Sequence, residues 1–241
     1  MSIRLYEIGF ARGLFSAVVV LGGAAAPAAM AADQGQLTVV ELFQSQGCSS
    51  CPPADANVQA IADRPDVLAL SFGVTYWDNL GWKDTFASPQ YTDRQWDYAR
   101  AFHRDQVFTP EVVVNGRADV VGQDRGELEA LIHREAAGSS APAISIADDR
   151  VQIGVSNIPA TNADVWLVRY DPRIEQVPIA RGENGGRTLP HKNVVKELVK
   201  LGSWSGKAES FAIPQTPRSN LRAAVLIQQG PGGVIVAAAS S

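Results

Sequence analysis

Apolar and polar residues follow two different rhythms along the chain, and the change falls near Ser140. In the N-terminal region, short apolar runs alternate with stretches whose apolar residues recur every three or four positions. The first pattern is typical of buried strands, and the second is typical of helices that pack by one face. The predicted order is strand, helix, strand, helix, strand, strand and helix, over Val39–Phe43, Pro52–Arg64, Val67–Val74, Pro89–His103, Glu111–Val114, Ala118–Val121 and Gly126–Ala137.

Local signals mark the ends of several of these elements. Ser88 is a suitable N-cap for the second helix, which then begins with a proline in its first turn. Asp124 is the expected cap of the third helix. The dipeptide Asn115-Gly116 favours a type I′ turn and therefore predicts a hairpin between its two flanking strands.

After a small, flexible run from Gly138 to Pro142, short apolar runs are separated by turn residues. Many short strands with turn signals between them are typical of an antiparallel sandwich. The segment Val194–Leu201 fits a helix nearly as well as a strand. The predicted strands are Ala143–Ala147, Val151–Ser156, Asp164–Tyr170, Val177–Arg181, Lys207–Ile213, Ala223–Gln229 and Val234–Ala238.

The element order of the N-terminal region is the thioredoxin order. With 241 residues and 46% hydrophobic content, the chain is long enough for two cores. We therefore expect an α/β thioredoxin-like domain over residues 37–138, followed by a small all-β sandwich-like domain over residues 142–240.

The N-terminus has the three segments of a secretory signal peptide. Arg4 and Arg12 supply positive charge, Leu14–Ala26 is an apolar core, and small residues precede a cleavage site near Ala31. We expect residues 1–31 to be removed and the mature protein to be periplasmic or secreted. The apolar core is too short to span a bilayer comfortably, and no later stretch is long enough, so we expect no stable membrane insertion.

Charge narrows the classes of partner. Removal of the leader takes away Arg4, Arg12 and Glu7, which changes the formal net charge from −4 to −5. The remaining basic residues are dispersed rather than clustered. This distribution does not favour binding to nucleic acid or to an anionic membrane.

The chain has two cysteines, Cys48 and Cys51, between a predicted strand and a predicted helix. This spacing and position are typical of a redox-active pair. A structural disulfide is an alternative, but closing so short a loop stabilises the fold by only about 2 kcal/mol in the loop-entropy formula. Inert free thiols are a further alternative, which an oxidising compartment disfavours.

A metal site is another alternative for the two thiols. Zinc would need two more ligands, and the histidines at 103, 133 and 191 are scattered through the sequence. Two cysteines and one distant histidine could still bind copper or another soft metal. We expect neither a cofactor nor a resident metal.

The position of the cysteines predicts their roles. Cys48 would lie just before a helix N-terminus, where the helix dipole favours its thiolate and makes it the attacking sulfur. Cys51 would resolve the mixed disulfide. Glu41 interrupts an apolar strand and could take the proton of the resolving thiol, or it could face solvent at the strand end.

Two further segments are candidate substrate contacts. In this fold the proline before the third strand is usually cis, so we expect a cis Thr109-Pro110 bond that faces the cysteines and presents Thr109 to a substrate peptide. Trp77 and Trp82 lie in a polar loop and could line a groove there. They could equally pack on the second domain. The polar, glycine-rich segment Gly182–Asn193 could dock against the redox domain or form a mobile surface hairpin.

Several of these segments together closely resemble a secreted, mainly bacterial thioredoxin-like family that is catalogued as a domain of unknown function. The resemblance covers roughly residues 37–240, and its most specific motif is CSSCPPAD. It implies a thioredoxin-like domain followed by a β-rich domain, and it supplies no substrate. The matching segments are Val39–Phe43, Ser45–Asp55, Tyr76–Asp78, Leu80–Asp84, Thr109-Pro110, Val114–Arg117, Glu183–Leu189 and Asn193–Val195.

Three functional hypotheses follow. The first is an exported thiol–disulfide oxidoreductase whose partners are protein thiols or disulfides. The second is an extracytoplasmic binding module with a passive disulfide. The third is a copper or soft-metal chaperone. The direction of electron flow depends on tens of millivolts, which the sequence does not reveal.

Overall fold

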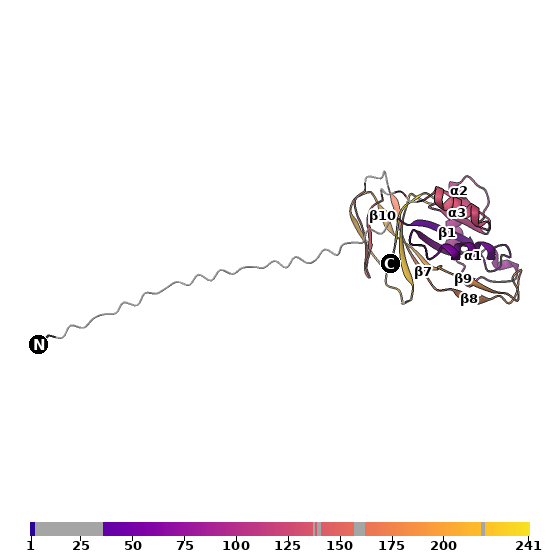
Figure 1. Ribbon diagram of the computed structural model, residues 1–241, viewed down its shortest axis with the longest axis horizontal. Helices are drawn as coiled ribbons and strands as arrows, with labels where there is room; N and C mark the ends of the chain where they lie inside the picture. The colour runs from indigo at the N-terminus through magenta and orange to yellow at the C-terminus, as the bar shows by residue number, and fades with distance from the viewer. Residues whose placement is uncertain (3–35, 137, 139–140, 157–161, 218–219) are drawn as a thin grey trace. The chain divides into compact units, whose positions relative to one another are not determined.

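Strands from both halves of the chain join one hydrogen-bonded sheet in the computed structural model (Figure 1). The structure describes residues 1–2, 36–136, 138, 141–156, 162–217 and 220–241. Among these residues the large sheet has eight strands, in the order β13-β12-β7-β10-β2-β1-β3-β4. Their bounds are β1 Thr38–Gln44, β2 Val67–Gly73, β3 Glu111–Val114, β4 Ala118–Val120, β7 Ala163–Asp171, β10 Val194–Trp204, β12 Arg222–Gln228 and β13 Ile235–Ser240.

The junction between the two halves is the pairing of β2 with β10. The two strands run parallel, with Val194 opposite Ser71. Asn193 extends the junction: its carbonyl accepts a hydrogen bond from the Ser71 N–H at 3.0 Å, and its Nδ2 donates to the Ala69 carbonyl at 2.8 Å. The edge of β2 that the first half leaves open is therefore covered by the second half.

Three short α-helices among the described residues cover the sheet around β1. Alternate residues of a strand point to opposite faces. Val40 and Leu42 accordingly pack with α1 (Pro52–Ile61) and α3 (Arg125–Arg134), whereas Val39 and Phe43 pack on the side of α2 (Pro89–Ala101). The cysteine-bearing turn precedes α1, so it belongs to the α1–α3 face.

The remaining strands form two small sheets. A three-stranded sheet, β11-β6-β5, covers a portion of the large sheet through an apolar cluster that includes Val151, Leu167 and Trp204. A separate two-stranded hairpin, β8-β9, lies between β7 and β10 in the chain and beside α1 (Figure 1). The bounds are β5 Ile144–Ile146, β6 Arg150–Ile153, β8 Glu175–Pro178, β9 Thr188–His191 and β11 Glu209–Ala212.

The expected fold class, an α/β thioredoxin-like domain followed by a small all-β sandwich-like domain, is wrong. The protein is mostly sheet, and its large mixed sheet takes strands from both sides of the run at 138–142. The described residues from 36 to 241 pack together as a single compact unit. Hydrophobic periodicity reports which face of a strand is buried and does not report which strand is its neighbour, so the pattern could not reveal the β2–β10 pairing.

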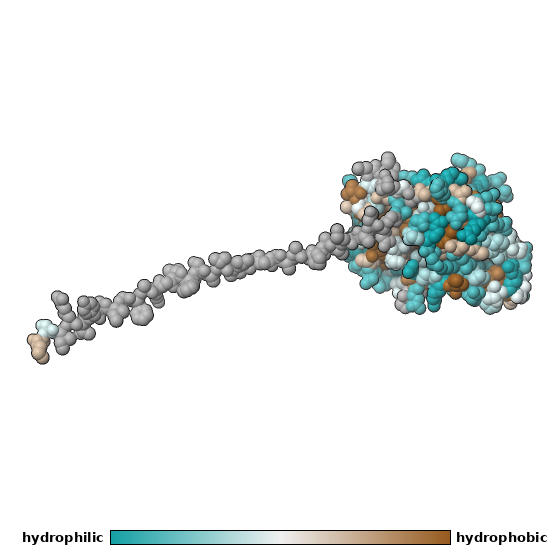
Figure 2. Space-filling view, viewed as in Figure 1, coloured by the Kyte–Doolittle hydropathy of each residue, from teal (hydrophilic) through white to brown (hydrophobic). Residues whose placement is uncertain are grey.

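Most single elements lie close to their predicted ranges. The ambiguous segment from Val194 is strand β10, and β9 was not predicted. The signal peptide expected over residues 1–31 falls almost entirely outside the described residues. Among the residues that the structure does describe, no helix has the length and apolar character needed to cross a membrane. On the face visible in Figure 2, hydrophilic side chains predominate and apolar ones are scattered.

Candidate functional site

Cys48 and Cys51 form a disulfide in the turn that leads into α1. Their Cα atoms are 5.4 Å apart, and the Cys51 N–H donates a hydrogen bond to the Cys48 carbonyl at 3.2 Å. Cys51 is the N-cap residue of α1, and its carbonyl accepts the helical hydrogen bond from the Asp55 N–H at 3.0 Å. Ser50 Oγ lies 3.2 Å from Cys48 Sγ. A thiolate formed here would face the positive end of the α1 dipole.

Both cysteines are buried, although the turn itself is at the surface. Cys48 is 0% exposed and Cys51 is 1% exposed, whereas Ser49 and Ser50 between them are exposed. A disulfide exchanges by direct attack of a thiolate on one of its sulfurs. The sulfurs must therefore be uncovered before a macromolecular thiol can reach them.

The tip of the β8-β9 hairpin, residues 181–187, is hydrogen-bonded to the loop that carries Cys48. Asn184 in this tip is fully buried, and its Nδ2 donates to the carbonyls of Gln46 and Cys48 at 3.0 and 2.9 Å. Glu183 Oε2 accepts a hydrogen bond from the Ser49 N–H at 3.1 Å. Hydrogen bonding by the Ser49 side chain and by this N–H lowers the pKa of the Glu183 carboxyl. The hairpin tip thus holds the backbone on both sides of Cys48.

Side chains from the loop after β2 hold the backbone just before Cys48 in place. Asp84 Oδ2 accepts a hydrogen bond from the Gln46 N–H at 2.7 Å, and Asp84 Oδ1 accepts one from the Phe86 N–H at 2.7 Å. The Gln46 side-chain carbonyl accepts a hydrogen bond from Trp82 Nε1 at 2.9 Å. Burial raises the pKa of Asp84, and the two backbone hydrogen bonds oppose that rise.

A second polar pair lies where β9 meets α1. His191 is 1% exposed, and its Nδ1 lies 3.5 Å from Oδ1 of the buried Asp55. Among the described residues, neither ring nitrogen of His191 makes a hydrogen bond. Its ring packs edge-on against Phe86, with the centroids 5.6 Å apart. Burial raises the pKa of Asp55, with the neighbouring histidine acting in the opposite direction.

The structure does not bring Glu41 to the cysteines. Glu41 is on the α2 face of β1, where its carboxylate is bonded to Arg94 at 2.7 and 3.1 Å and also to the Tyr98 hydroxyl. Arg94 in turn reaches Gln228 of β12 at 3.0 Å. The odd polar residue in the strand therefore anchors α2 to the sheet, on the face opposite to α1.

The structure confirms that the Thr109-Pro110 bond is cis. Trp77 Nε1 donates to Thr109 Oγ1 at 2.8 Å, and a side chain added at Gly47 would meet Trp77 Cβ at 3.5 Å. Trp77 therefore connects residue 109 to the cysteine loop. The roles of Thr109, Pro110 and Trp77 in contacting a substrate stay predictions.

Trp82 packs toward the second half of the chain. A Cβ atom at Gly182 of the hairpin tip would lie 3.3 Å from Trp82 Cβ. Trp82 thus lies between Gln46 and the hairpin tip. Trp82 therefore contacts the second half of the chain, and its role in lining a groove for a substrate stays a prediction.

Glu111 is a buried acid that sequence reasoning missed. It follows the cis proline, is 1% exposed, and accepts a hydrogen bond from Gln95 Nε2 at 2.7 Å. Burial raises its pKa to about 7, with Asp119 adding to the rise and Arg104 opposing it. A charged residue opening a strand of three valines was the available signal.

Asn184 was missed as an individual residue, although the docking of its glycine-rich segment was one of the two alternatives that the sequence left open. His191, which the sequence could not place, belongs to the same hairpin. Among the described residues, no group of three or more histidine, cysteine, aspartate or glutamate side chains is arranged to hold a metal ion.

The described residues form a mixed sheet in which a disulfide closes the turn into α1 and a hairpin is bonded to that turn. Comparisons with known proteins give the family. The profile of a family described as "Protein of unknown function (DUF1223)" matches residues 39–228. The chain belongs to this family. No curated protein matches it.

Two solved structures are similar to this one. Protein AGR_C_4864 from Agrobacterium tumefaciens is 32% identical, with a TM-score of 0.70, over 86% of this chain and 95% of that one. HBP35 of Porphyromonas gingivalis is 11% identical, with a TM-score of 0.57, over 86% of this chain and 74% of that one. The second likeness concerns the fold alone.

Proposed function

We propose that this chain is an exported thiol–disulfide exchange protein and that Cys48–Cys51 is its redox centre. The observation that carries the proposal is the disulfide itself, which closes the turn into the N-terminus of α1. A ring this short contributes only about 2 kcal/mol as a staple, so stability alone is a weak reason for it. A helix N-terminus lowers the pKa of a thiol and makes its thiolate a good attacking or leaving group.

Exchange with a dithiol partner takes place in two steps. A partner thiolate attacks Cys48 Sγ and forms a mixed disulfide, while the Cys48–Cys51 bond breaks and Cys51 leaves as a thiolate. The second partner thiolate attacks the partner sulfur of the mixed disulfide and releases Cys48. Two electrons pass from the partner to the pair, and the two new thiolates take up the protons that the partner thiols lost. The reverse sequence reduces a partner disulfide and re-forms the Cys48–Cys51 disulfide.

Export and the class of partner belong to the same proposal. The leader-like residues 1–31 favour a periplasmic or secreted protein, in a compartment where disulfides persist. The partners in this proposal are thiols or disulfides of other proteins. Thr109, Pro110 and Trp77 are the proposed contacts for their backbone and side chains, because Trp77 joins Thr109 to the cysteine loop.

The burial of both cysteines favours a second candidate, an extracytoplasmic binding module with a passive disulfide. With exposures of 0% and 1%, neither sulfur is available to a partner in the covered arrangement. In this candidate the disulfide only shapes the turn between β1 and α1. Loss of Cys48 would then leave the binding of a partner intact.

The experiment that separates the two is the redox equilibrium of the pair in graded glutathione buffers, read by alkylation of the mature protein. For an exchange protein we expect a measurable midpoint and faster alkylation of Cys48 than of Cys51. The variant C51A should trap a mixed disulfide through Cys48, and C48A, as its matched control, should trap none. A pair that stays oxidised in strongly reducing buffer, with thiols that react only after unfolding, would refute exchange and favour the binding module.

A further inference from the structure

We propose that the β8-β9 hairpin is a gate over the Cys48–Cys51 disulfide and that Asn184 is its latch. This inference rests on the proposed function for its biological meaning, although the gate itself can be tested as a matter of access. The closed gate is the arrangement seen here, with the hairpin tip bonded to the cysteine loop. In the open gate, the tip leaves that loop and Cys48 Sγ becomes reachable.

The hairpin is built to move without disturbing the sheet. It follows β7 and precedes β10, both of which are strands of the large sheet, yet β8 and β9 pair only with each other. Segments with few buried apolar contacts open at a small fraction of the free energy of global unfolding. Within residues 175–191 the buried side chains are Ile179, Asn184, Leu189 and His191.

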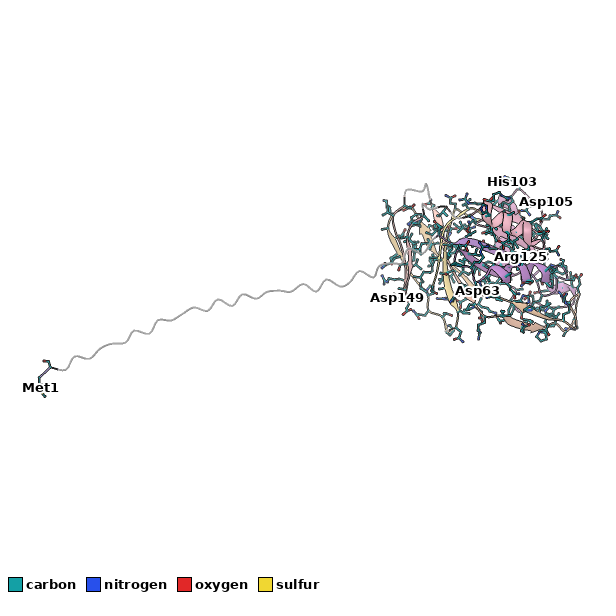
Figure 3. The ribbon with its side chains drawn as sticks, viewed as in Figure 1. Met1, Asp63, His103, Asp105, Arg125 and Asp149 are labelled. Atoms are coloured by element: carbon teal, nitrogen blue, oxygen red, sulfur yellow. A yellow bond between two sulfur atoms is a disulfide. The ribbon has the colours of Figure 1, made fainter. Side chains whose placement is uncertain are left out.

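Polar contacts join the hairpin and the following residue, Lys192, to α1 and to the turn just after it. Asp55 and Gln59 are spaced by four residues and so lie on one side of α1, and Asp63 follows just after the helix ends at Ile61. Gln59 Nε2 donates to the Pro190 carbonyl at 2.9 Å, and Lys192 Nζ lies 2.5 Å from Oδ2 of the exposed Asp63, which is labelled in Figure 3. Exposed contacts of this kind contribute little and can exchange with water.

In the closed arrangement, the ring nitrogens of His191 are buried without hydrogen bonds among the described residues. Its Nδ1 meets the Asp55 carboxylate only in an ion-pair contact at 3.5 Å. A buried polar group without a hydrogen bond opposes burial, because water would satisfy it. Opening of the hairpin would hydrate this imidazole, which reduces the free energy of opening.

Asn184 makes the buried hydrogen bonds that join the tip to the cysteine loop. Its amide group donates both of its hydrogen bonds to the backbone around Cys48, and its carbonyl accepts one from Arg187 Nη1 at 2.6 Å. Gly182 allows the close approach of the tip to Trp82 and has a φ of +78°, which L side chains rarely adopt. The latch is therefore one side chain, and a single substitution can remove it.

The test is the rate at which dithiothreitol reduces the disulfide of the mature full chain under native conditions. For N184A we expect reduction to be faster by about tenfold or more, since each lost hydrogen bond raises the open population severalfold. The matched control is N115A. Asn115 is also buried and also holds two backbone groups, the Val39 N–H and the Glu135 carbonyl, but it lies in the β3–β4 turn. We expect N115A to be reduced at the wild-type rate.

Reduction of N184A at the wild-type rate, or equal acceleration of N184A and N115A, would overturn the gate. If N184A does not fold, E183A removes only the bond to Ser49 at the exposed side of the tip, and we expect about a twofold to threefold acceleration. The absence of any acceleration in a folded E183A would then count against the gate.

The same measurements keep the gate and the proposed function apart. Fast reduction of N184A, together with no exchange of the wild-type pair in glutathione buffers, means that the gate is real and the exchange function is wrong. An exchanging wild-type pair, together with an N184A variant that is no faster, means that the function stands and the gate does not.

Discussion

Glu41 and Asn184 show how far a single residue can be understood from its neighbours in sequence. Glu41 stands out among apolar residues, and the strand pattern correctly predicts that it is unusual. Its partner Arg94 lies 53 residues away on α2, so the pattern could not indicate that the carboxylate is bound in an ion pair on the opposite face from α1. Asn184 lies in a glycine-rich segment that the sequence analysis singled out, but that pattern does not indicate that its side chain reaches the Cys48 carbonyl.

We expect the ionisation of Glu111 to change the free energy of unfolding as the pH changes. Its pKa in the folded protein is about 7, above the ordinary 4.5, because the carboxyl group is buried. The folded state therefore binds this proton more tightly than the unfolded chain does. The resulting stabilisation is full below about pH 4.5 and is lost as the pH rises to 7, by about 2–3 kcal/mol.

We expect E111Q, which cannot ionise, to lose less stability than the wild type between pH 5 and 7. The measurement is the free energy of unfolding in urea at several pH values. E209Q, which alters an exposed glutamate, should reproduce the wild-type slope. Parallel curves for wild type and E111Q would show that Glu111 does not titrate in this range.

At the scale of elements, local chemistry predicts well and pairing does not. Prolines mark the starts of α1 and α2, and Ser88 is at the N-cap position of α2 although its side chain makes no capping hydrogen bond there. The Asp124 side chain does cap α3 by accepting from the Glu127 N–H. The β3–β4 hairpin follows from Asn115-Gly116, both of which have positive φ. The hairpin β8-β9 escaped full prediction because its strands are short and carry few buried residues.

The turn between β12 and β13 packs against α2 through the backbone of a glycine, Gly232. A Cβ at Gly232 would lie 2.1 Å from the Asp97 carbonyl oxygen, whereas a Cβ at Gly230 would meet nothing within 4 Å. Both glycines have positive φ, at +65° and +71°. Substitution by alanine therefore strains the backbone at both positions but creates a clash with α2 only at the first.

We expect G230A to destabilise the fold by about 1 kcal/mol through strain alone. G232A should cost at least about 2 kcal/mol more, because the opposing group is backbone and cannot rotate away. Urea unfolding of the two variants, followed by tryptophan fluorescence, measures the difference. Equal losses would mean that the turn relaxes away from α2 at little cost.

For the whole molecule, the decisive feature is the continuity of the sheet across the two halves. The sequence indicates two regions of different pattern, and this is correct as a description of local structure. The assembly of those regions depends on β10 covering the edge of β2 and on Arg94 reaching Gln228. Both contacts join residues more than 100 positions apart in the chain, where sequence pattern carries no information about pairing.

This continuity predicts cooperative unfolding of residues 36–241. An uncovered β2 would leave unpaired backbone groups along a buried, apolar strand, so neither half has a satisfactory structure alone. We expect one calorimetric transition whose van't Hoff and calorimetric enthalpies agree. Two resolved transitions, or a separately expressed 36–136 segment that unfolds cooperatively as a monomer, would contradict this expectation.

The distance along the chain between the disulfide and its cover also sets an order of events. Asn184 lies 136 residues after Cys48, so a chain made from its N-terminus presents both cysteines well before the hairpin exists. The thiols are then open to any oxidant that acts on the growing chain. Completion of the fold covers whichever state has formed by that time. The cysteine pair would thus retain the redox state that it reached during synthesis until the hairpin opens.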